Sequence, residues 1–186
     1  MPLGCQVQRP FALAVAGAAG SGKTTLGRAL ARLLRVPMLD LDTLTNPLLD
    51  RLGKDVFGGH WLSSAHAGVV RQGRYAALAA TAAEVLETTG GVVLVAPFTR
   101  ELAGGDEWRA LLAGVAPAAV HVVHLVGDGT LLAARRAARG HDRDLHRPDT
   151  VPTRVGIPVL SIDARLSPRR QADRVALELG LDVAAG

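Results

Sequence analysis

The sequence of 186 residues contains one cysteine, Cys5, so it cannot build an internal disulfide framework. Aromatic residues make up only 3% of the chain, so its core must be assembled mainly from alanine, leucine and valine. No stretch approaches the ~20 apolar residues that a membrane span needs, and residues 1–10 lack the apolar segment of a secretory signal. These absences predict a soluble, cytoplasmic protein that folds as one domain over residues 1–186.

Lysine is nearly absent, because the chain has 2 lysines, Lys23 and Lys54, against 19 arginines. Arginine suits planar, bidentate recognition of phosphate and carboxylate groups, although a GC-rich coding sequence would produce the same excess. The net charge of +4 would permit a nucleic-acid partner. However, the chain has no stripe of interleaved aromatic and basic residues on which bases could stack, which disfavours such a partner.

Short apolar runs alternate with segments of helical periodicity along the chain. After an irregular leader over residues 1–10, we expect strands at residues 11–16, 36–42, 92–98, 119–127 and 157–164. Between them we expect helices, including a short one at 45–53 and a long one at 69–89, separated by a loop. Because the strands are apolar throughout, we predict a three-layer α/β/α fold with a mainly five-stranded parallel sheet.

Residues 17–24 read GAAGSGKT and match the pattern G-x-x-x-x-G-K-[ST] between a predicted strand and a predicted helix. Backbone N–H groups of such a loop converge on an anion, and the start of the helix adds a partial positive charge. We therefore expect Lys23 to reach the β- and γ-phosphates of a nucleotide and Thr24 to ligate Mg²⁺. Further nucleotide contacts are expected from Gly17, Gly20, Ser21, Gly22 and Thr25.

The pattern at residues 17–24 is that of a P-loop, which several classes of nucleotide-binding protein share. Two motifs that this chain lacks narrow the choice among these classes. No guanine-reading N-K-x-D motif follows a predicted strand, since lysine occurs only at positions 23 and 54. The third predicted strand ends in Ala96-Pro97-Phe98-Thr99, without the acidic pair typical of AAA, ABC and helicase-type ATPases. These absences disfavour GTPases and motor ATPases.

Two carboxylates, Asp40 and Asp42, instead follow the second predicted strand. On an extended chain both side chains point to one face, and if this strand lies beside the first they reach the phosphate end of the site. One carboxylate could hold Mg²⁺ through water while the other accepts a proton from a substrate hydroxyl. The alternative is a helix cap, because Asp42-Thr43 precedes a short helical stretch.

Together these features resemble the small-molecule and nucleoside-type kinases of the P-loop superfamily. That group includes shikimate kinase, gluconate kinase, chloramphenicol phosphotransferase and related AAA-type ATP-binding kinases. By this resemblance Asp40 supports Mg²⁺ and Asp42 is the base that orients or deprotonates the acceptor hydroxyl. The resemblance also implies a lid after the fourth strand, at about residues 139–152, whose arginines cover the phosphates.

Arginines cluster where this resemblance places the lid. Arg136 and Arg143 have the spacing of the shikimate kinase pair, in which the first stacks on adenine and the second contacts the transferred phosphate. Arg139 is a competing candidate for the second role. A solvated basic helix end would give the same cluster, because arginine favours helix C-termini.

The resemblance further places an acceptor pocket between the second and third strands. Arg74 lies near the position where shikimate kinase holds a carboxylate. Shikimate kinase has three glycines after its third strand, where this chain has Ala96-Pro97-Phe98-Thr99, so shikimate is not the expected substrate. Trp61 and Phe98 indicate a flatter or more apolar acceptor. The acceptor-side candidates are Asp42, His60, Arg71, Arg74, Phe98 and Arg100.

The sequence thus predicts a monomeric or homodimeric phosphotransferase that uses ATP and Mg²⁺ to phosphorylate a hydroxyl of a sugar acid, a nucleoside or an antibiotic-like molecule. One rival is a regulatory nucleotide-binding protein that transfers nothing or hydrolyses weakly. Another is a nucleotide or polynucleotide 5′-kinase. The two carboxylates and the arginine-rich lid favour phosphoryl transfer over switching.

Overall fold

The computed structural model describes residues 10–139 and 154–180, and its sheet has five parallel strands. The strands are β1 (Phe11–Gly17), β2 (Met38–Asp40), β3 (Gly91–Val95), β4 (Ala119–Val126) and β5 (Leu160–Asp163), in the spatial order β2-β3-β1-β4-β5. The predicted five-stranded parallel sheet is therefore confirmed. The second strand, however, does not lie beside the first, because β3 pairs with both and separates them.

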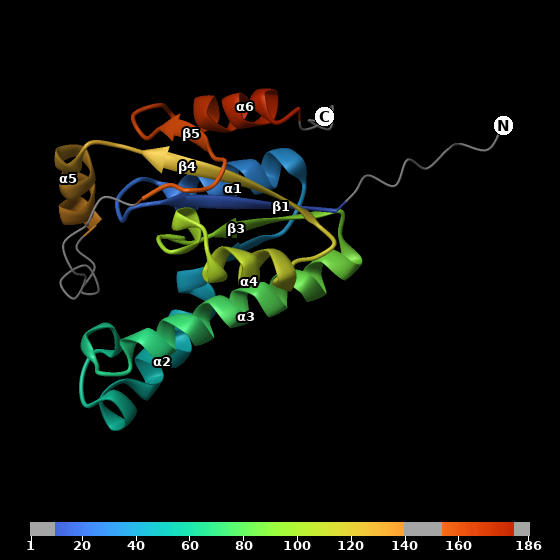
Figure 1. The fold of residues 1–186 in the computed structure, drawn as a ribbon. Coiled ribbons are helices and arrows are strands. Elements are labelled where there is room, and N and C mark those ends of the chain that lie inside the picture. The colour runs from blue at the N-terminus through green and yellow to red at the C-terminus, as the bar shows by residue number, and fades with distance from the viewer. Residues whose placement is uncertain (1–9, 140–153, 181–186) are drawn as a thin grey trace.

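Helices cover both faces of this sheet (Figure 1). On one face lie α1 (Lys23–Leu34) and α6 (Pro168–Glu178), and on the other lie α3 (Ala67–Thr88) and α4 (Asp106–Gly114). The remaining helices are α2 (Leu41–Phe57), α5 (Gly129–Arg139) and the short 3₁₀ turns η1 (Trp61–Ser63) and η2 (Glu101–Ala103). This arrangement confirms the predicted three-layer fold. No helix in the described ranges is both long and apolar enough to cross a membrane.

The central strand β1 divides its side chains between two hydrophobic clusters. Leu13 and Val15 pack with residues of α1 and α6, whereas Ala12 and Ala14 pack with residues of α3 and α4. Successive side chains of a strand point to opposite faces, so an entirely apolar strand is the sequence that two covered faces require. Because both faces are filled, a ligand can reach the sheet only at the strand ends.

The start of α2 differs from the prediction. The helix begins at Leu41 rather than at residue 45, and it resumes after a break at Gly53 (φ 16°, ψ −117°) to end at Phe57. The reason is a cap: Asp40 Oδ1 accepts the backbone N–H groups of Asp42 and Thr43, at 3.0 and 3.3 Å. The segment 54–68, predicted as a loop, therefore contains the end of α2 together with η1.

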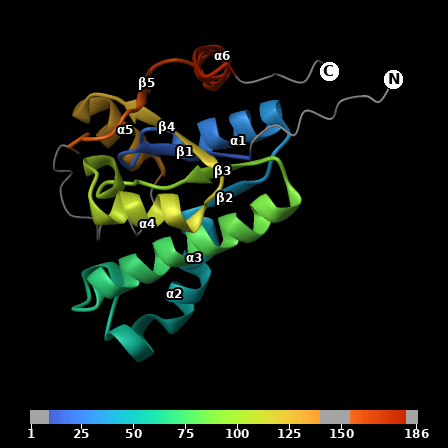
Figure 2. The ribbon, with the colours of Figure 1, turned by 45° about the vertical axis from the view of Figure 1, so that its right-hand side comes forward.

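At the other end of the chain the predicted cap is confirmed. The Ser167 side chain accepts the N–H of Arg170, and Pro168 takes the first helical position of α6. Figures 1 and 2 show that α2 and the first half of α3 project from the sheet, while the second half of α3 covers it. We call α2, η1 and the first half of α3 the α2–α3 arm.

Candidate active site

The loop between β1 and α1 packs so closely that two of its residues have no room for a side chain. A Cβ on Gly17 (φ 143°) would lie 2.8 Å from the carbonyl oxygen of Leu125, at the end of β4. A Cβ on Gly20 (φ 87°) would lie 2.5 Å from the carbonyl oxygen of Leu132 in α5. The two glycines thus let the loop backbone lie against β4 and α5. The loop then leads directly into the N-terminus of α1.

Polar groups of the loop gather at the start of α1. Gly22 (φ 96°) is the N-cap and offers no side-chain cap to the first turn, in which Thr25 is exposed. The hydroxyl of Ser21 is completely buried and has no hydrogen-bond partner among the described residues. Lys23 Nζ donates to the carbonyl oxygen of Ala18 at 2.9 Å, so the ammonium group lies back across the loop.

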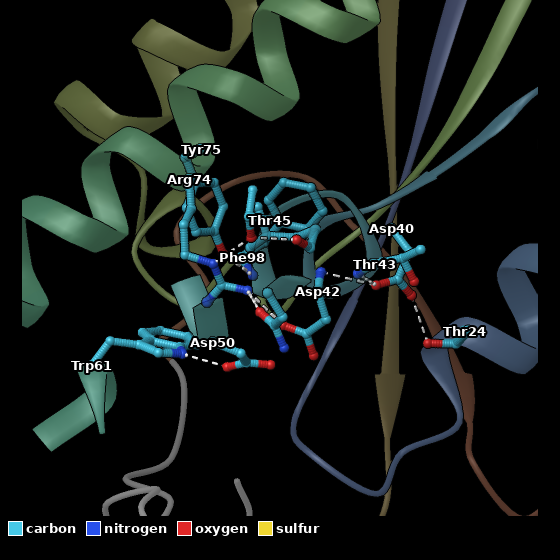
Figure 3. A network of polar contacts seen from close by, with 12 residues as sticks. Thr24, Asp40, Asp42, Thr43, Thr45, Asp50, Trp61, Arg74, Tyr75 and Phe98 are labelled. Atoms are coloured by element: carbon cyan, nitrogen blue, oxygen red, sulfur yellow. Dashed lines mark hydrogen bonds and ion pairs between the residues drawn. The ribbon is translucent and has the colours of Figure 1, made fainter. Parts of the chain in front are cut away.

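A hydrogen bond joins this loop to the α2–α3 arm. The Thr24 hydroxyl donates to Asp40 Oδ2 at 2.8 Å, and the other oxygen of the same carboxylate caps α2 (Figure 3). Asp40 is 8% exposed, so both oxygens are used inside the protein. The helix-cap role that the sequence suggested for Asp42 therefore belongs to Asp40.

Asp42 lies in the first turn of α2, and its Oδ1 accepts from Arg74 Nη2 at 2.6 Å. The expectation that Asp40 and Asp42 share one face of an extended strand is wrong, because the strand ends at Asp40 and the chain turns into a helix. The two carboxylates instead have different partners, Thr24 for Asp40 and Arg74 for Asp42 (Figure 3).

Arg74 is the centre of a polar network in the α2–α3 arm. Its Nε donates to Thr45 Oγ1 at 2.7 Å, and its Nη2 also donates to Asn46 Oδ1 at 2.9 Å. The guanidinium carbon lies 4.6 Å from the ring centroid of Trp61, which is within range of a cation–π interaction. Trp61 Nε1 in turn donates to Asp50 Oδ1 at 3.1 Å (Figure 3).

One turn earlier in α3, Arg71 takes part in a second network. Its Nη2 lies 2.9 and 2.8 Å from the two carboxylate oxygens of Glu101, and its guanidinium lies 4.3 Å from the ring centroid of Tyr75. The Tyr75 hydroxyl accepts the backbone N–H of Phe98 at 2.9 Å. Burial, reinforced by the nearby Glu101 carboxylate, raises the pKa of the Tyr75 phenol above its ordinary value.

The other acceptor-side candidates have three different settings. Phe98 is 1% exposed, and its ring belongs to the core on the α3 side of the sheet, held by a left-handed backbone (φ 50°). His60 caps η1 through Nδ1 and stacks on Trp61, with the ring centroids 5.5 Å apart. Arg100 is exposed and forms an ion pair with Glu107 at 3.4 Å.

Of the predicted lid arginines, the structure places Arg136 beside the loop of residues 17–24, which we call the phosphate-binding loop. Its Nη1 donates to the carbonyl oxygen of Ala19 at 3.2 Å, and its Cγ would lie 3.3 Å from a Cβ on Gly20. Arg139 ends α5, but its side chain lies outside the described residues, as do Arg143 and the segment 140–153. Their assignment to a lid stays a prediction.

Sequence reasoning missed five polar residues of this region, one of them Asp50, which accepts the Trp61 N–H. Thr45 and Asn46 lie three and four residues after Asp42 and so share its helix face, a signal that the correct start of α2 would have revealed. Glu101 gave no local signal, because its importance comes from burial beside Arg71. His124, half-buried on β4, has a pKa lowered by burial and, to a smaller extent, by the charge of Lys23.

Comparison with known proteins shows what the sequence and the fold of this chain resemble. Over 88 residues the chain is 38% identical to a shikimate kinase of Salinispora tropica, a match that covers 47% of this chain and about half (52%) of that protein. The fold is similar to that of a gluconokinase from Sinorhizobium meliloti 1021, with a TM-score of 0.62, 22% identity and coverage of 93% and 97%. It is also similar to a sugar kinase from Janibacter sp. HTCC2649, with a TM-score of 0.61, 18% identity and coverage of 94% and 96%.

The likenesses to these two solved structures, at 18% and 22% identity, show the fold alone. The family described as the AAA domain matches residues 13–156 and so spans both the phosphate-binding loop and the α2–α3 arm. Since the match extends over most of the sequence, this chain belongs to that family of P-loop proteins.

Proposed function

We propose that this protein is a phosphotransferase that uses ATP and Mg²⁺ to phosphorylate a hydroxyl group of a small molecule. The observation that carries the proposal is the hydrogen bond from Thr24 in the phosphate-binding loop to Asp40, next to a helix that presents Asp42. The names of the similar proteins, a shikimate kinase, a gluconokinase and a sugar kinase, support the same reaction class. Since ATP is the phosphoryl donor, we place the reaction in the cytoplasm.

The residues present fit a bound nucleotide with its metal ion. The loop has glycines where a Cβ would collide, and the buried Ser21 hydroxyl has no partner among the described residues, as expected where a ligand completes the site. Mg²⁺ is usually held by one or two carboxylates together with substrate phosphates. The described residues contain no group of three metal-ligating side chains, so Thr24 and Asp40 are the pair we assign to it. When bound, Mg²⁺ neutralises charge on the phosphates.

In this proposal each side chain has a distinct task. Lys23 and the loop amides bind the phosphates, and Arg136 holds the loop from the side of α5. Asp42 orients the acceptor hydroxyl and takes its proton as the acceptor oxygen bonds to the γ-phosphorus and the bond to the β-phosphate oxygen breaks. Arg74 is a positioning residue, because it fixes the Asp42 carboxylate.

The test is ADP release by the full chain, measured with and without a panel of hydroxylated small molecules. We expect one acceptor to stimulate release, and Lys23→Ala to lower the stimulated rate by about 10³-fold, since a charged donor to the phosphates is lost. Arg32→Ala, which removes an exposed cation from the last turn of the same helix, is the matched control and should be fully active.

Two results would contradict the proposal. ADP release that responds to a partner protein and to none of the small molecules would indicate a regulatory nucleotide-binding protein. Normal turnover in Lys23→Ala would show that the loop does not bind the phosphates.

A further inference from the structure

The strand β4 carries two histidines, His121 and His124, among apolar residues. His124 pairs with Ala16 of β1, one residue before Leu125 pairs with Gly17, the first residue of the phosphate-binding loop. His124 therefore lies at the carboxyl end of the sheet, which is where ligands of parallel α/β folds bind. The proposed reaction gives this histidine no task.

The alternation of the strand directs the two histidines to opposite faces of the sheet. Val123 and Leu125 belong to the core on the side of α1 and α6, whereas Val122 belongs to the core on the side of α3 and α4. Since successive side chains alternate, His121 shares the face of Val123, and His124 shares that of Val122. His124 thus lies on the face that α3 covers and from which the α2–α3 arm projects (Figure 1).

The neighbours of His124 on this face are small or polar. Its partners in register are Ala16 on β1 and Ser161 on β5. Ala96, which follows β3, belongs to the same core cluster as Ala16. Alanine side chains are too short to cover an imidazole, and His124 is accordingly only half-buried, while Ser161 is exposed. The end of β4 is therefore a polar position beside an otherwise apolar core.

His124 and Ser161 differ from the other polar groups of the site in having no internal partner. Within residues 10–139 and 154–180, neither the imidazole nor the Ser161 hydroxyl has a hydrogen-bond partner, whereas the Arg74 guanidinium has three. Burial and, to a smaller extent, the charge of Lys23 lower the pKa of His124, so the ring is uncharged at neutral pH. A neutral imidazole offers one N–H donor and one nitrogen acceptor, which a hydroxyl group complements.

We propose that His124 is a specificity-determining residue that hydrogen-bonds a hydroxyl of the acceptor other than the one that receives phosphate. This role rests on the proposed phosphotransferase function, in which Asp42 meets the reacting hydroxyl. Two strands, β3 and β1, separate β2 from β4, a span of roughly 14 Å at the ordinary spacing of neighbouring strands. Side chains that reach inward from both ends shorten this span to the size of a small polyhydroxylated molecule, whose far hydroxyl then lies toward His124.

The test compares an acceptor with analogues that each lack one hydroxyl. ADP release by the full chain is first measured with glucose, gluconate and thymidine among the panel, and the best acceptor is then compared with its monodeoxy analogues. A site that hydrogen-bonds a hydroxyl discriminates against the analogue that lacks it. For one hydroxyl that is not phosphorylated, we expect the wild-type kcat/KM to fall by about tenfold or more in the deoxy analogue.

Substitutions then assign this discrimination to a residue. His124→Phe keeps a flat ring but removes both nitrogens, so it should abolish the discrimination at that hydroxyl and raise the KM of the full acceptor about tenfold. The KM for ATP should stay unchanged, because the phosphate-binding loop is intact. His124→Ala, which adds no bulk, provides the same test if His124→Phe does not fold. The matched control is His121→Phe, the same change on the opposite face of β4, which should keep the wild-type discrimination.

The outcomes separate this role from the proposed function. Discrimination that is lost in His124→Phe and kept in His121→Phe supports the role. Unchanged discrimination in the His124 variants, with or without a lower melting temperature, overturns it and leaves phosphoryl transfer in place, because the ring then contacts water or serves the fold alone. ADP release that no acceptor stimulates, in a protein that still binds ATP, overturns the proposed function and this role together.

Discussion

The phosphate-binding loop and the α2–α3 arm are built in different ways. The loop is a short continuous segment whose shape comes from glycine backbone and from the end of a strand. The polar networks of the arm are assembled from side chains far apart in the sequence: Arg71 meets Glu101 across 30 residues, and Arg74 meets Asp42 across 32. The loop can therefore be recognised from a local motif, whereas the ion pairs of the arm depend on which distant residues the fold brings together.

The two regions meet at one residue. Asp40 receives the Thr24 hydroxyl from the loop and the first N–H groups of α2 from the arm. A change at Asp40 should consequently affect both regions, whereas a change at Asp42 or Arg71 should affect the arm alone. The following experiments test that division.

Asp42→Asn should have the largest effect. The substitution keeps an oxygen for Arg74 but removes the carboxylate that we propose as the base, so kcat with the true acceptor should fall by about 10²–10⁴-fold. ATP affinity should stay unchanged, because the loop is intact. Steady-state kinetics and ATP titration measure the two effects. Asp55→Asn, at an exposed position of the same helix and outside the Arg74 network, is the control, and full activity in Asp42→Asn would reduce Asp42 to a partner of Arg74.

Arg71→Met should destabilise the arm by leaving Glu101 buried and unpaired. We expect the free energy of unfolding to fall by about 3 kcal/mol, measured by chemical denaturation. The double variant Arg71→Met/Glu101→Met removes both charges and should recover most of that loss. As a control, Arg165→Met breaks an exposed pair with Asp128 and should change stability little. Equal destabilisation by the single and double variants would contradict the role of the unpaired charge.

Asp40→Asn should act on both regions at once. Asn still caps α2, so the melting temperature should change little. The carboxylate that accepts the Thr24 hydroxyl is lost, however, and the Mg²⁺ concentration for half-maximal activity should rise by about tenfold or more. Thr24→Ser keeps the hydroxyl and should preserve the Mg²⁺ requirement. An unchanged requirement in Asp40→Asn would place the metal ion elsewhere.

The smallest expected effect is on the pH dependence of stability. It involves His124 on β4, near the phosphate-binding loop and outside the arm. Burial lowers the pKa of His124 below its ordinary 6.5, so the unfolded chain binds more protons than the folded one as pH falls below about 6.5. Stability should therefore decrease in that range, and His124→Asn should make the decrease shallower. Melting curves between pH 7.5 and about 5 compare the two proteins. His66→Asn, at an exposed position, serves as control, and identical slopes for wild type and His124→Asn would contradict the prediction.

Much of the fold could be predicted because its signals are local. Apolar runs, helical spacing and the cap at Ser167 each depend on neighbouring residues, and the structure has five parallel strands and a helix at each of the main predicted positions. The loop of residues 17–24 was recognised for the same reason, since its glycines and its following helix are contiguous.

The errors lie at a local cap that belongs to Asp40 rather than Asp42, and at positions where distant residues decide. The second strand ends at Asp40 because that side chain caps α2 and accepts the Thr24 hydroxyl, and β3 separates it from β1. Phe98 was predicted from its position to contact the acceptor, and the structure places its ring in the core on the α3 side of the sheet.

What the sequence by itself determined is the alternation of strands and helices and the phosphate-binding loop, because backbone geometry over a few residues follows from glycine, apolar spacing and caps. Only the tertiary structure decided the order of the strands and the partners of Arg71 and Arg74. An ion pair forms between the groups that folding brings within 3 Å in a partly buried space, and residues 30 positions apart carry no local sign of that meeting.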